Sequence, residues 1–181
     1  MLRDLKGSTE LYERIGDLNA LALVQQHFER LQEVTVRHGG VIVKTLGDAV
    51  MAAFMTPATA VSGVLAMQAE IARFNETRPE RDLLLKIGVH RGAAIAVTLN
   101  DRLDYFGQSV NIASRVGALA EGGEICFTRE VHDAPEVQEL LQTYRVSVAS
   151  VQLKGIHETV PVWRVREDMP EVGSLRRSRV M

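Results

Sequence analysis

Two stretches of the chain carry apolar residues at steps of three and four, the spacing of an amphipathic helix. The first runs from Leu18 to about His38, with Asp17 placed to cap its start. Its predicted buried face consists of Leu21, Val24, Phe28 and Leu31. The second begins after Thr56, a predicted N-cap, and ends near Asn75. Two helices with one apolar face each predict a helical layer packed on a sheet.

Shorter runs of β-branched and apolar residues predict strands. Residues 41–45 and 49–54 flank Leu46-Gly47-Asp48, which predicts a β-hairpin with Asp48 at its tip. Residues 83–89 and 93–98 predict another strand pair around Arg91-Gly92, followed by a polar loop over residues 100–104. Further elements are expected in chain order: a helix over 109–119, a strand over 124–128, a short helix over 136–142, and strands over about 144–153 and 160–165.

The alternation of strands and helices with short connections predicts an α+β fold, a sandwich of helices on one mixed sheet. We expect one domain over residues 1–166 and a polar, mobile tail over 167–181. The opening Met1-Leu2-Arg3-Asp4 resembles the last residues of a strand. We therefore expect a shortened first strand and a chain cut from a longer protein, with Asp4 close to a frayed end.

Composition excludes several classes of protein. Lys plus Arg (21) nearly balances Asp plus Glu (23), so no wide basic face for nucleic acid is implied. No apolar stretch approaches a membrane span, and no signal peptide is evident, so a cytoplasmic protein without membrane contact is expected. Cys126 is predicted to be a buried small hydrophobe. The histidines show no metal-ligand spacing and are interpreted as structural or surface residues: His27, His38, His90, His132 and His157.

Asp4 and Asp48 each follow an apolar run, where a carboxylate would emerge at the edge of a sheet. Adjacent strands would bring the two together as a site for Mg²⁺ or Mn²⁺. Ordinary turn chemistry explains Asp48 equally well. Lys6-Gly7-Ser8-Thr9 could present backbone N–H groups to a phosphate ahead of a helix, although this pattern alone is not specific.

Asn111 and Arg115 stand four residues apart on the third predicted helix, so they share a face and could reach one ligand. An arginine there could neutralise developing phosphate charge, and a solvated helix face is the alternative. Lys44 and Asp104 are ambiguous by themselves, because a strand lysine and a loop aspartate are common surface residues.

Three segments together resemble the motifs of class III nucleotidyl cyclases. They are DLKGST at residues 4–9, KTLGD at residues 44–48 and DYFGQSVNIASR at residues 104–115, of which the last is the most specific. The similarity runs from Asp4 to about Arg166. It implies the ferredoxin-like α/β sandwich of nucleotide cyclases, with a mixed, mainly antiparallel sheet.

The resemblance also implies a role for each matching residue. Asp4 and Asp48 match the aspartates that hold two divalent cations, Mg²⁺ or Mn²⁺, with the Leu5 carbonyl as a further ligand. Lys44 and Asp104 match the pair that selects adenine. Asn111 matches the residue that orients the ribose, and Arg115 the one that stabilises the transition state.

For the phosphates, the resemblance points to Lys154, a looser match, beside the backbone of Lys6, Gly7, Ser8 and Thr9. The implied reaction is attack of the ribose 3′ oxygen of ATP on the α-phosphorus, which gives cyclic AMP and pyrophosphate. The site of the family lies between two subunits, so we expect a homodimer with the metal aspartates from one chain and Lys44, Asp104, Asn111 and Arg115 from the other.

Two alternatives stay open at this point: a guanylate cyclase, or a nucleotide-binding regulatory module that keeps the fold without catalysis. Family members are commonly fused to a sensor, so a regulatory domain is expected elsewhere in a longer protein.

Overall fold

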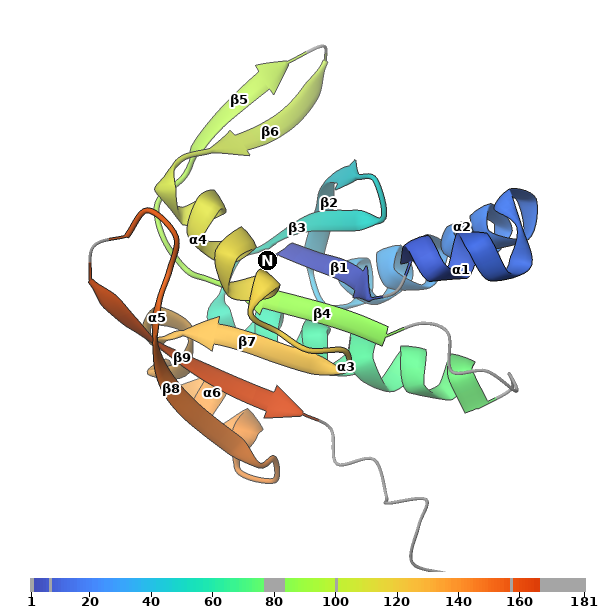
Figure 1. Cartoon of the computed structure of the whole chain (residues 1–181). Coiled ribbons are helices and arrows are strands. Elements are labelled where there is room, and N and C mark those ends of the chain that lie inside the picture. The colour runs from blue at the N-terminus through green and yellow to red at the C-terminus, as the bar shows by residue number, and fades with distance from the viewer. Residues whose placement is uncertain (1, 7, 77–83, 100, 157, 167–181) are drawn as a thin grey trace, which may run out of the picture.

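Seven strands of the computed structural model form one sheet (Figure 1), and two more form a separate hairpin. The model describes residues 2–6, 8–76, 84–99, 101–156 and 158–166, and of residues 2–6 and 8–10 the backbone alone. The sheet strands are β1 (Leu2–Lys6), β2 (Gly40–Leu46), β3 (Ala49–Phe54), β4 (Leu84–Val89), β7 (Glu124–Thr128), β8 (Val146–Gln152) and β9 (Thr159–Arg166). Their order is β2-β3-β1-β4-β7-β9-β8. β4 and β7 are parallel, and the other neighbours pair antiparallel.

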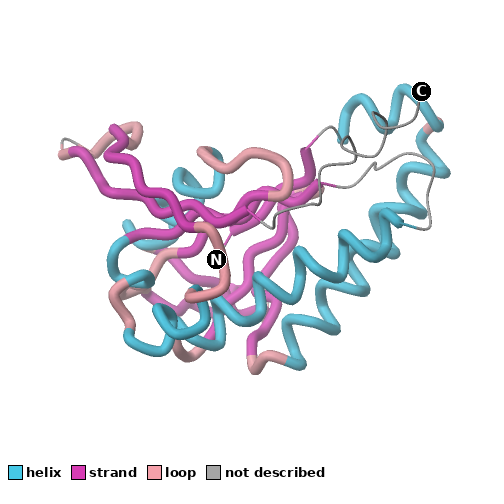
Figure 2. The backbone as a smooth tube through the Cα atoms, turned by 90° about the horizontal axis from the view of Figure 1, so that it is seen from below, coloured by secondary structure: helices cyan, strands magenta, loops and turns pink. Residues whose placement is uncertain are grey.

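Helices cover both faces of this sheet. They are α1 (Ser8–Ile15), α2 (Asp17–Arg37), α3 (Pro57–Glu76), α4 (Gln108–Ala118), α5 (Arg129–His132) and α6 (Pro135–Leu141). Strand β7 is buried on both sides: Ile125 and Phe127 belong to the core under α2, α3, α5 and α6, whereas Cys126 packs with Val116 of α4. The alternation along one strand thus separates a large core from a small core beneath α4. Figure 2 shows the two long helices side by side along one face of the sheet.

The hairpin of β5 (Ile95–Leu99) and β6 (Arg102–Phe106) stands away from the sheet, and we call it the arm (Figure 1). The predicted pairing of residues 83–89 with 93–98 is therefore wrong. Both edges of β4 are occupied, by β1 and β7, so the next strand pairs forward with β6. The predicted polar loop over 100–104 is also wrong for its last residues, because Asp104 lies within β6.

The two long predicted helices are confirmed, with changes in detail. Asp17 is the first residue of α2 rather than its cap. The N-cap position is held by Gly16, at φ 79°, which has no side chain to form a capping hydrogen bond. Leu21 was predicted to be buried but is 47% exposed, whereas Val24 and Leu31 are in the core. At the start of α3, Thr56 Oγ1 accepts the backbone N–H of Thr59, as an N-cap does.

The β2–β3 hairpin is confirmed, with Gly47 and Asp48 in its turn. Cys126 is fully buried, and burial raises the pKa of its thiol to about 11, so it acts as a packing residue. None of the helices in the described part of the chain has the length and apolar character needed to cross a bilayer. The predicted tail over 167–181 lies outside the described residues.

Candidate active site

Lys44 on β2 and Asp104 on the arm form an ion pair, with 2.7 Å between Nζ and Oδ2. Their side chains are 31% and 17% exposed, so the pair is only partly open to water. A β-bulge sets up this contact: Ile42 pairs with Ala52 but Lys44 pairs with Met51, which leaves one extra residue in β2. Without that residue Lys44 would point to the opposite face of the sheet.

Asp104 is held in place from two sides. Its Oδ1 accepts the backbone N–H of Tyr105 at 2.8 Å, while Oδ2 accepts from Lys44. The hydrogen bond from Lys44 is the main cause that lowers the pKa of the Asp104 carboxyl below its ordinary value. The ammonium of Lys44 also lies 5.5 Å from the ring centre of Phe106, a cation–π contact. The arrangement presents one ammonium donor and one carboxylate acceptor side by side.

Helix α4 begins directly after the arm, so the arm and the helix form one continuous segment. Gly107, at φ 133°, makes the turn between them. The helix lies close against β4: a Cβ at Gly88 would be 2.2 Å from the backbone nitrogen of Gly117 and 2.5 Å from the carbonyl oxygen of Ala113. Only a glycine at position 88 lets the helix backbone approach the strand this closely.

This helix carries Asn111 and Arg115 on one face, as predicted from their spacing. Asn111 is exposed and Arg115 is half-buried. Gly155, in the turn after β8, adopts φ 72°, and a Cβ there would lie 3.5 Å from Nη2 of Arg115. The guanidinium of Arg115 therefore rests against the turn that carries Lys154, which is exposed. Two predicted phosphate-facing cations, from segments far apart in the sequence, thus come from adjoining elements.

The two predicted metal aspartates lie on neighbouring strands. In the antiparallel pairing of β1 and β3, Leu2 faces Met51 and Arg3 faces Val50. Continuing this register by one residue on each strand brings Asp4 opposite Ala49, the residue after Asp48. Two carboxylates at such positions, together with the Leu5 carbonyl, would make an all-oxygen donor set of the kind that Mg²⁺ or Mn²⁺ takes. Asp48 is half-buried, and the side chain of Asp4 is outside the described part.

β1 leads into α1 at Ser8, where a phosphate-binding loop was predicted. Gly7 and the side chains of Lys6, Ser8 and Thr9 lie outside the described part of the chain. The phosphate-binding loop therefore stays a prediction. The described residues contain no group of three or more His, Cys, Asp or Glu side chains that could hold a metal ion.

The sequence model of the adenylate and guanylate cyclase catalytic domain matches residues 1–165. The chain belongs to this family. An adenylate cyclase of Neurospora crassa is 31% identical, over 80% of this chain and 7% of that protein. The chain spans less than a tenth of that relative, so the matched part is one domain of a larger protein there. The predicted class III cyclase resemblance is thereby confirmed.

Solved structures of cyclase domains have the same fold. The crystal structure of an adenylyl cyclase from P. aeruginosa superposes with a TM-score of 0.75 at 22% identity, covering 95% of this chain and 94% of that chain. The guanylate cyclase domain from Catenaria anguillulae, solved with GTP, superposes with a TM-score of 0.76 at 21% identity, covering 92% and 94%. The predicted sandwich fold is confirmed. Because both kinds of cyclase match equally well, substrate choice must be argued from side chains.

Sequence reasoning missed several features of this cyclase domain. Neither the contact of Phe106 with Lys44 nor the bulge in β2 is indicated by any pattern in the sequence. The histidines form scaffold contacts: His38 with Ser62 at 3.0 Å, His90 with Thr128 at 2.8 Å, and His132 stacked on Trp163. His157 lies outside the described residues.

Proposed function

We propose that this domain is an adenylate cyclase that converts ATP to 3′,5′-cyclic AMP and pyrophosphate. The observation that carries the proposal is the Lys44–Asp104 pair. Adenine offers N1 as an acceptor and its exocyclic amine as a donor, which match an ammonium and a carboxylate. Guanine offers an N–H at position 1 and a carbonyl at position 6, so both protein groups would meet the wrong partner. Because the pair is only partly open to water, such a mismatch is poorly compensated by solvent and disfavours guanine.

The other residues take roles around the triphosphate. Asn111, one turn before Arg115 on α4, would orient the ribose, so that its 3′ oxygen lies in line with the α-phosphorus. As the 3′ hydroxyl gives its proton to solvent and its oxygen bonds to the α-phosphorus, the bond from that phosphorus to the bridging oxygen breaks and pyrophosphate leaves. Arg115 and Lys154 would neutralise the charge that develops on the α-phosphate and the leaving group.

Asp4 and Asp48 would hold divalent cations, Mg²⁺ or Mn²⁺, with the Leu5 carbonyl as a further ligand. Bound cations supply positive charge beside the phosphates and make the 3′ hydroxyl more acidic. The backbone of Lys6, Gly7, Ser8 and Thr9 would donate to the phosphates at the start of α1. No side chain is assigned as a general base.

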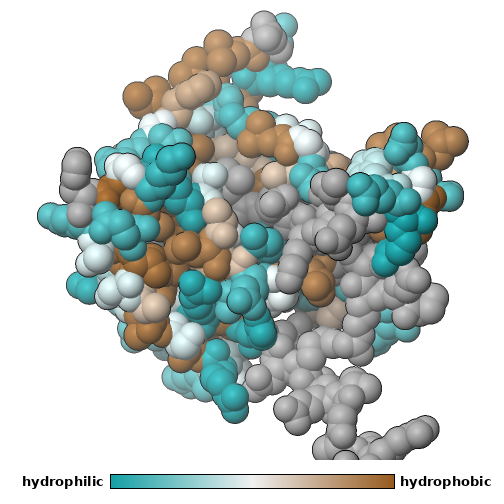
Figure 3. All heavy atoms as spheres, viewed as in Figure 1, coloured by the Kyte–Doolittle hydropathy of each residue, from teal (hydrophilic) through white to brown (hydrophobic). Residues whose placement is uncertain are grey.

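We propose that the active enzyme is a homodimer with sites at its interface. The exposed apolar side chains of the arm support this proposal: Ile95, Leu99, Leu103 and Phe106 are 43–67% exposed. In Figure 3 the arm carries several of the hydrophobic groups of that face. An isolated two-stranded hairpin is marginal in water. A second copy that covers the arm would bury these side chains and bring the metal half of one chain to the nucleotide half of the other.

The test is cyclic nucleotide formation from ATP and from GTP, with Mn²⁺ present, across a series of protein concentrations. We expect cyclic AMP, formed at a rate that rises more steeply than protein concentration where dimers dissociate. Asp48→Ala should abolish activity and leave the far-UV spectrum and thermal midpoint unchanged, whereas Asp17→Ala, at an exposed position on α2, should retain activity. Cyclic GMP as the main product would refute the adenine assignment. Nucleotide binding without pyrophosphate release would identify a regulatory module that has lost catalysis.

A further inference from the structure

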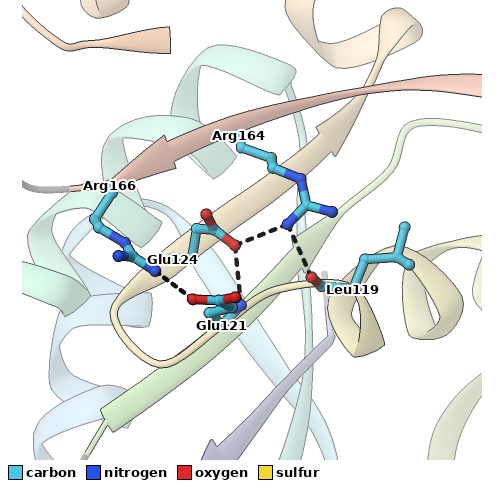
Figure 4. Close-up of polar contacts among 5 residues, drawn as sticks. All are labelled: Leu119, Glu121, Glu124, Arg164 and Arg166. Carbon is cyan, nitrogen blue, oxygen red and sulfur yellow. Dashed lines mark hydrogen bonds and ion pairs between the residues drawn. The ribbon is translucent and has the colours of Figure 1, made fainter. Parts of the chain in front are cut away.

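We propose that Arg164 and Glu124 are positioning residues for the cyclase reaction: they tether the C-terminal end of α4 and so hold Arg115 in place. This inference rests on the proposed function, because Arg115 is its catalytic arginine. Neither residue belongs to the motifs that indicated the activity, and both lie on the strands beneath α4. Their contacts are drawn in Figure 4.

The tether is a chain of hydrogen bonds from β9 to the end of α4. Nη1 of Arg164 donates to the carbonyl oxygen of Leu119 at 3.0 Å and to Oε2 of Glu124 at 3.1 Å (Figure 4). The same carboxylate oxygen accepts the backbone N–H of Glu121 at 2.9 Å. One ion pair therefore fixes both sides of the turn that ends the helix.

Leu119 is the C-cap of α4, so its carbonyl has no partner within the helix. A guanidinium at this end satisfies that carbonyl and opposes the negative end of the helix dipole. The last helical residues are closed by short-range bonds, from Leu119 N to Val116 O and from Ala120 N to Gly117 O. Without the arginine, the Leu119 carbonyl loses this partner, and the residues after it are held by the bond from Glu121 N–H to Glu124 and by the bond from Gly123 N to Leu85 O.

Arg115 precedes Leu119 by four residues, so the catalytic residue lies about one turn before the residue whose carbonyl is tethered. The close approach to Gly88 holds the C-terminal half of α4 at Ala113 and Gly117, on either side of Arg115. The tether adds a second anchor at Leu119, one turn after Arg115. The guanidinium of Arg115 lies against Gly155. A shift of the last turn would move that guanidinium relative to the phosphates.

Exposure to solvent distinguishes the Arg164–Glu124 pair from the neighbouring Arg166–Glu121 pair. The side chains of Glu124 and Arg164 are 12% and 25% exposed. Arg166, two residues on along β9, pairs with Glu121 at 2.8 Å, but those side chains are 54% and 70% exposed (Figure 4). An exposed pair contributes little to stability, and this one does not reach the helix carbonyl. Arg166→Met is therefore a matched control: the same substitution, on the same strand, in the same cluster.

The experiment compares wild type, Arg164→Met, Arg166→Met and the double variant Arg164→Met/Glu124→Met. Steady-state kinetics with ATP and Mn²⁺ are measured below the unfolding temperature of every variant, together with thermal midpoints and amide exchange of the α4 peptide. We expect Arg164→Met to lower kcat about 10- to 100-fold, because a displaced catalytic group loses alignment, while KM changes little. Arg166→Met should change kcat less than about twofold.

The double variant separates positioning from stability. It removes the buried unpaired carboxylate, so the thermal midpoint should recover relative to Arg164→Met. The Leu119 carbonyl is still untethered, so kcat should stay low and α4 amides should exchange faster than in Arg166→Met. Recovery of kcat together with the midpoint would overturn the proposal, as would equal kcat values for the two single variants. If wild type forms no cyclic nucleotide, the proposed function fails instead, and amide exchange still decides whether Arg164 holds α4.

Discussion

Nζ of Lys44 lies 2.7 Å from Oδ2 of Asp104, although the two residues are 60 positions apart in the sequence. The contact joins the edge strand β2 to the arm, and the arm continues through Gly107 into α4. The residues proposed to read the base and those proposed to act on the phosphates therefore belong to one connected unit. A substitution at the ion pair should therefore change the preference for adenine over guanine more than it changes the rate of the cyclisation step.

Lys44→Met should lower kcat/KM for ATP about 10- to 100-fold, the effect of losing a charged hydrogen bond to the base. Preference for ATP over GTP should narrow, because Asp104 alone remains to select the amine. Rates with both nucleotides at equal metal concentration check this. The control is Arg102→Met, at an exposed position on β6, the strand of Asp104. This variant should leave the preference for ATP unchanged. An unchanged preference in Lys44→Met would assign base selection to other residues.

Acid should weaken the coupling between the arm and β2. The hydrogen bond from Lys44 lowers the pKa of Asp104 from its ordinary value of 3.8. A carboxyl whose folded pKa is depressed stabilises the fold fully above the unfolded value, and that stability is lost as pH falls below 3.8 through the lowered pKa. Urea unfolding from about pH 6 to about pH 3 should show a smaller acid loss for Lys44→Met than for wild type. Identical acid limbs would show that the pair is not formed in solution.

The sequence predicted correctly those elements that depend only on residues close together in the chain. The α2 and α3 spacings, the Leu46-Gly47-Asp48 turn and the Thr56 cap each depend on a few adjacent residues, and each is present. The face of α2 was predicted less well, since Leu21 is on the apolar stripe but is 47% exposed. Ala20, Leu23 and Val24 of the same turn are buried, so Leu21 lies at the margin of the packed face, and spacing alone does not show how wide that face is.

Pairing partners could not be predicted in the same way. Residues 83–89 and 93–98 were predicted to pair with each other. However, β4 is a central strand whose edges are filled by β1, which precedes it in the sequence, and by β7, which follows it at a distance. The site shows the same division. Spacing alone placed Asn111 and Arg115 on one face, whereas the approach of Arg115 to Gly155 and the bulge before Lys44 depend on tertiary packing.

Gly88→Ala should destabilise the domain and displace α4. The new Cβ would lie 2.2 Å and 2.5 Å from backbone atoms of α4, which cannot rotate away as a side chain can. Overpacking of this kind costs about 1–3 kcal/mol, and the helix must move to relieve it. The free energy of unfolding, measured by chemical denaturation, and kcat should both fall. Gly39→Ala is the comparison: no atom lies within 4 Å of its Cβ, and its φ of 71° costs only about 1–2 kcal/mol.

In Gly39→Ala, far from α4, kcat per folded molecule should equal that of wild type. In Gly88→Ala it should be lower even under conditions where the protein is fully folded. Equal values for the two variants would mean that the position of α4 does not limit catalysis.

Mixing two inactive variants tests whether the site is shared between chains. Asp48→Ala removes a group from the metal half, and Arg115→Ala removes one from the nucleotide half. A heterodimer of the two has one site with both defects and one with neither. Random pairing puts half of the chains in heterodimers, each with one intact site of two, so the mixture should recover about a quarter of wild-type activity. Mixing Asn111→Ala with Arg115→Ala places a defect in every site and should recover none. If the first mixture stays inactive while analytical ultracentrifugation detects heterodimers, each chain must form its site alone.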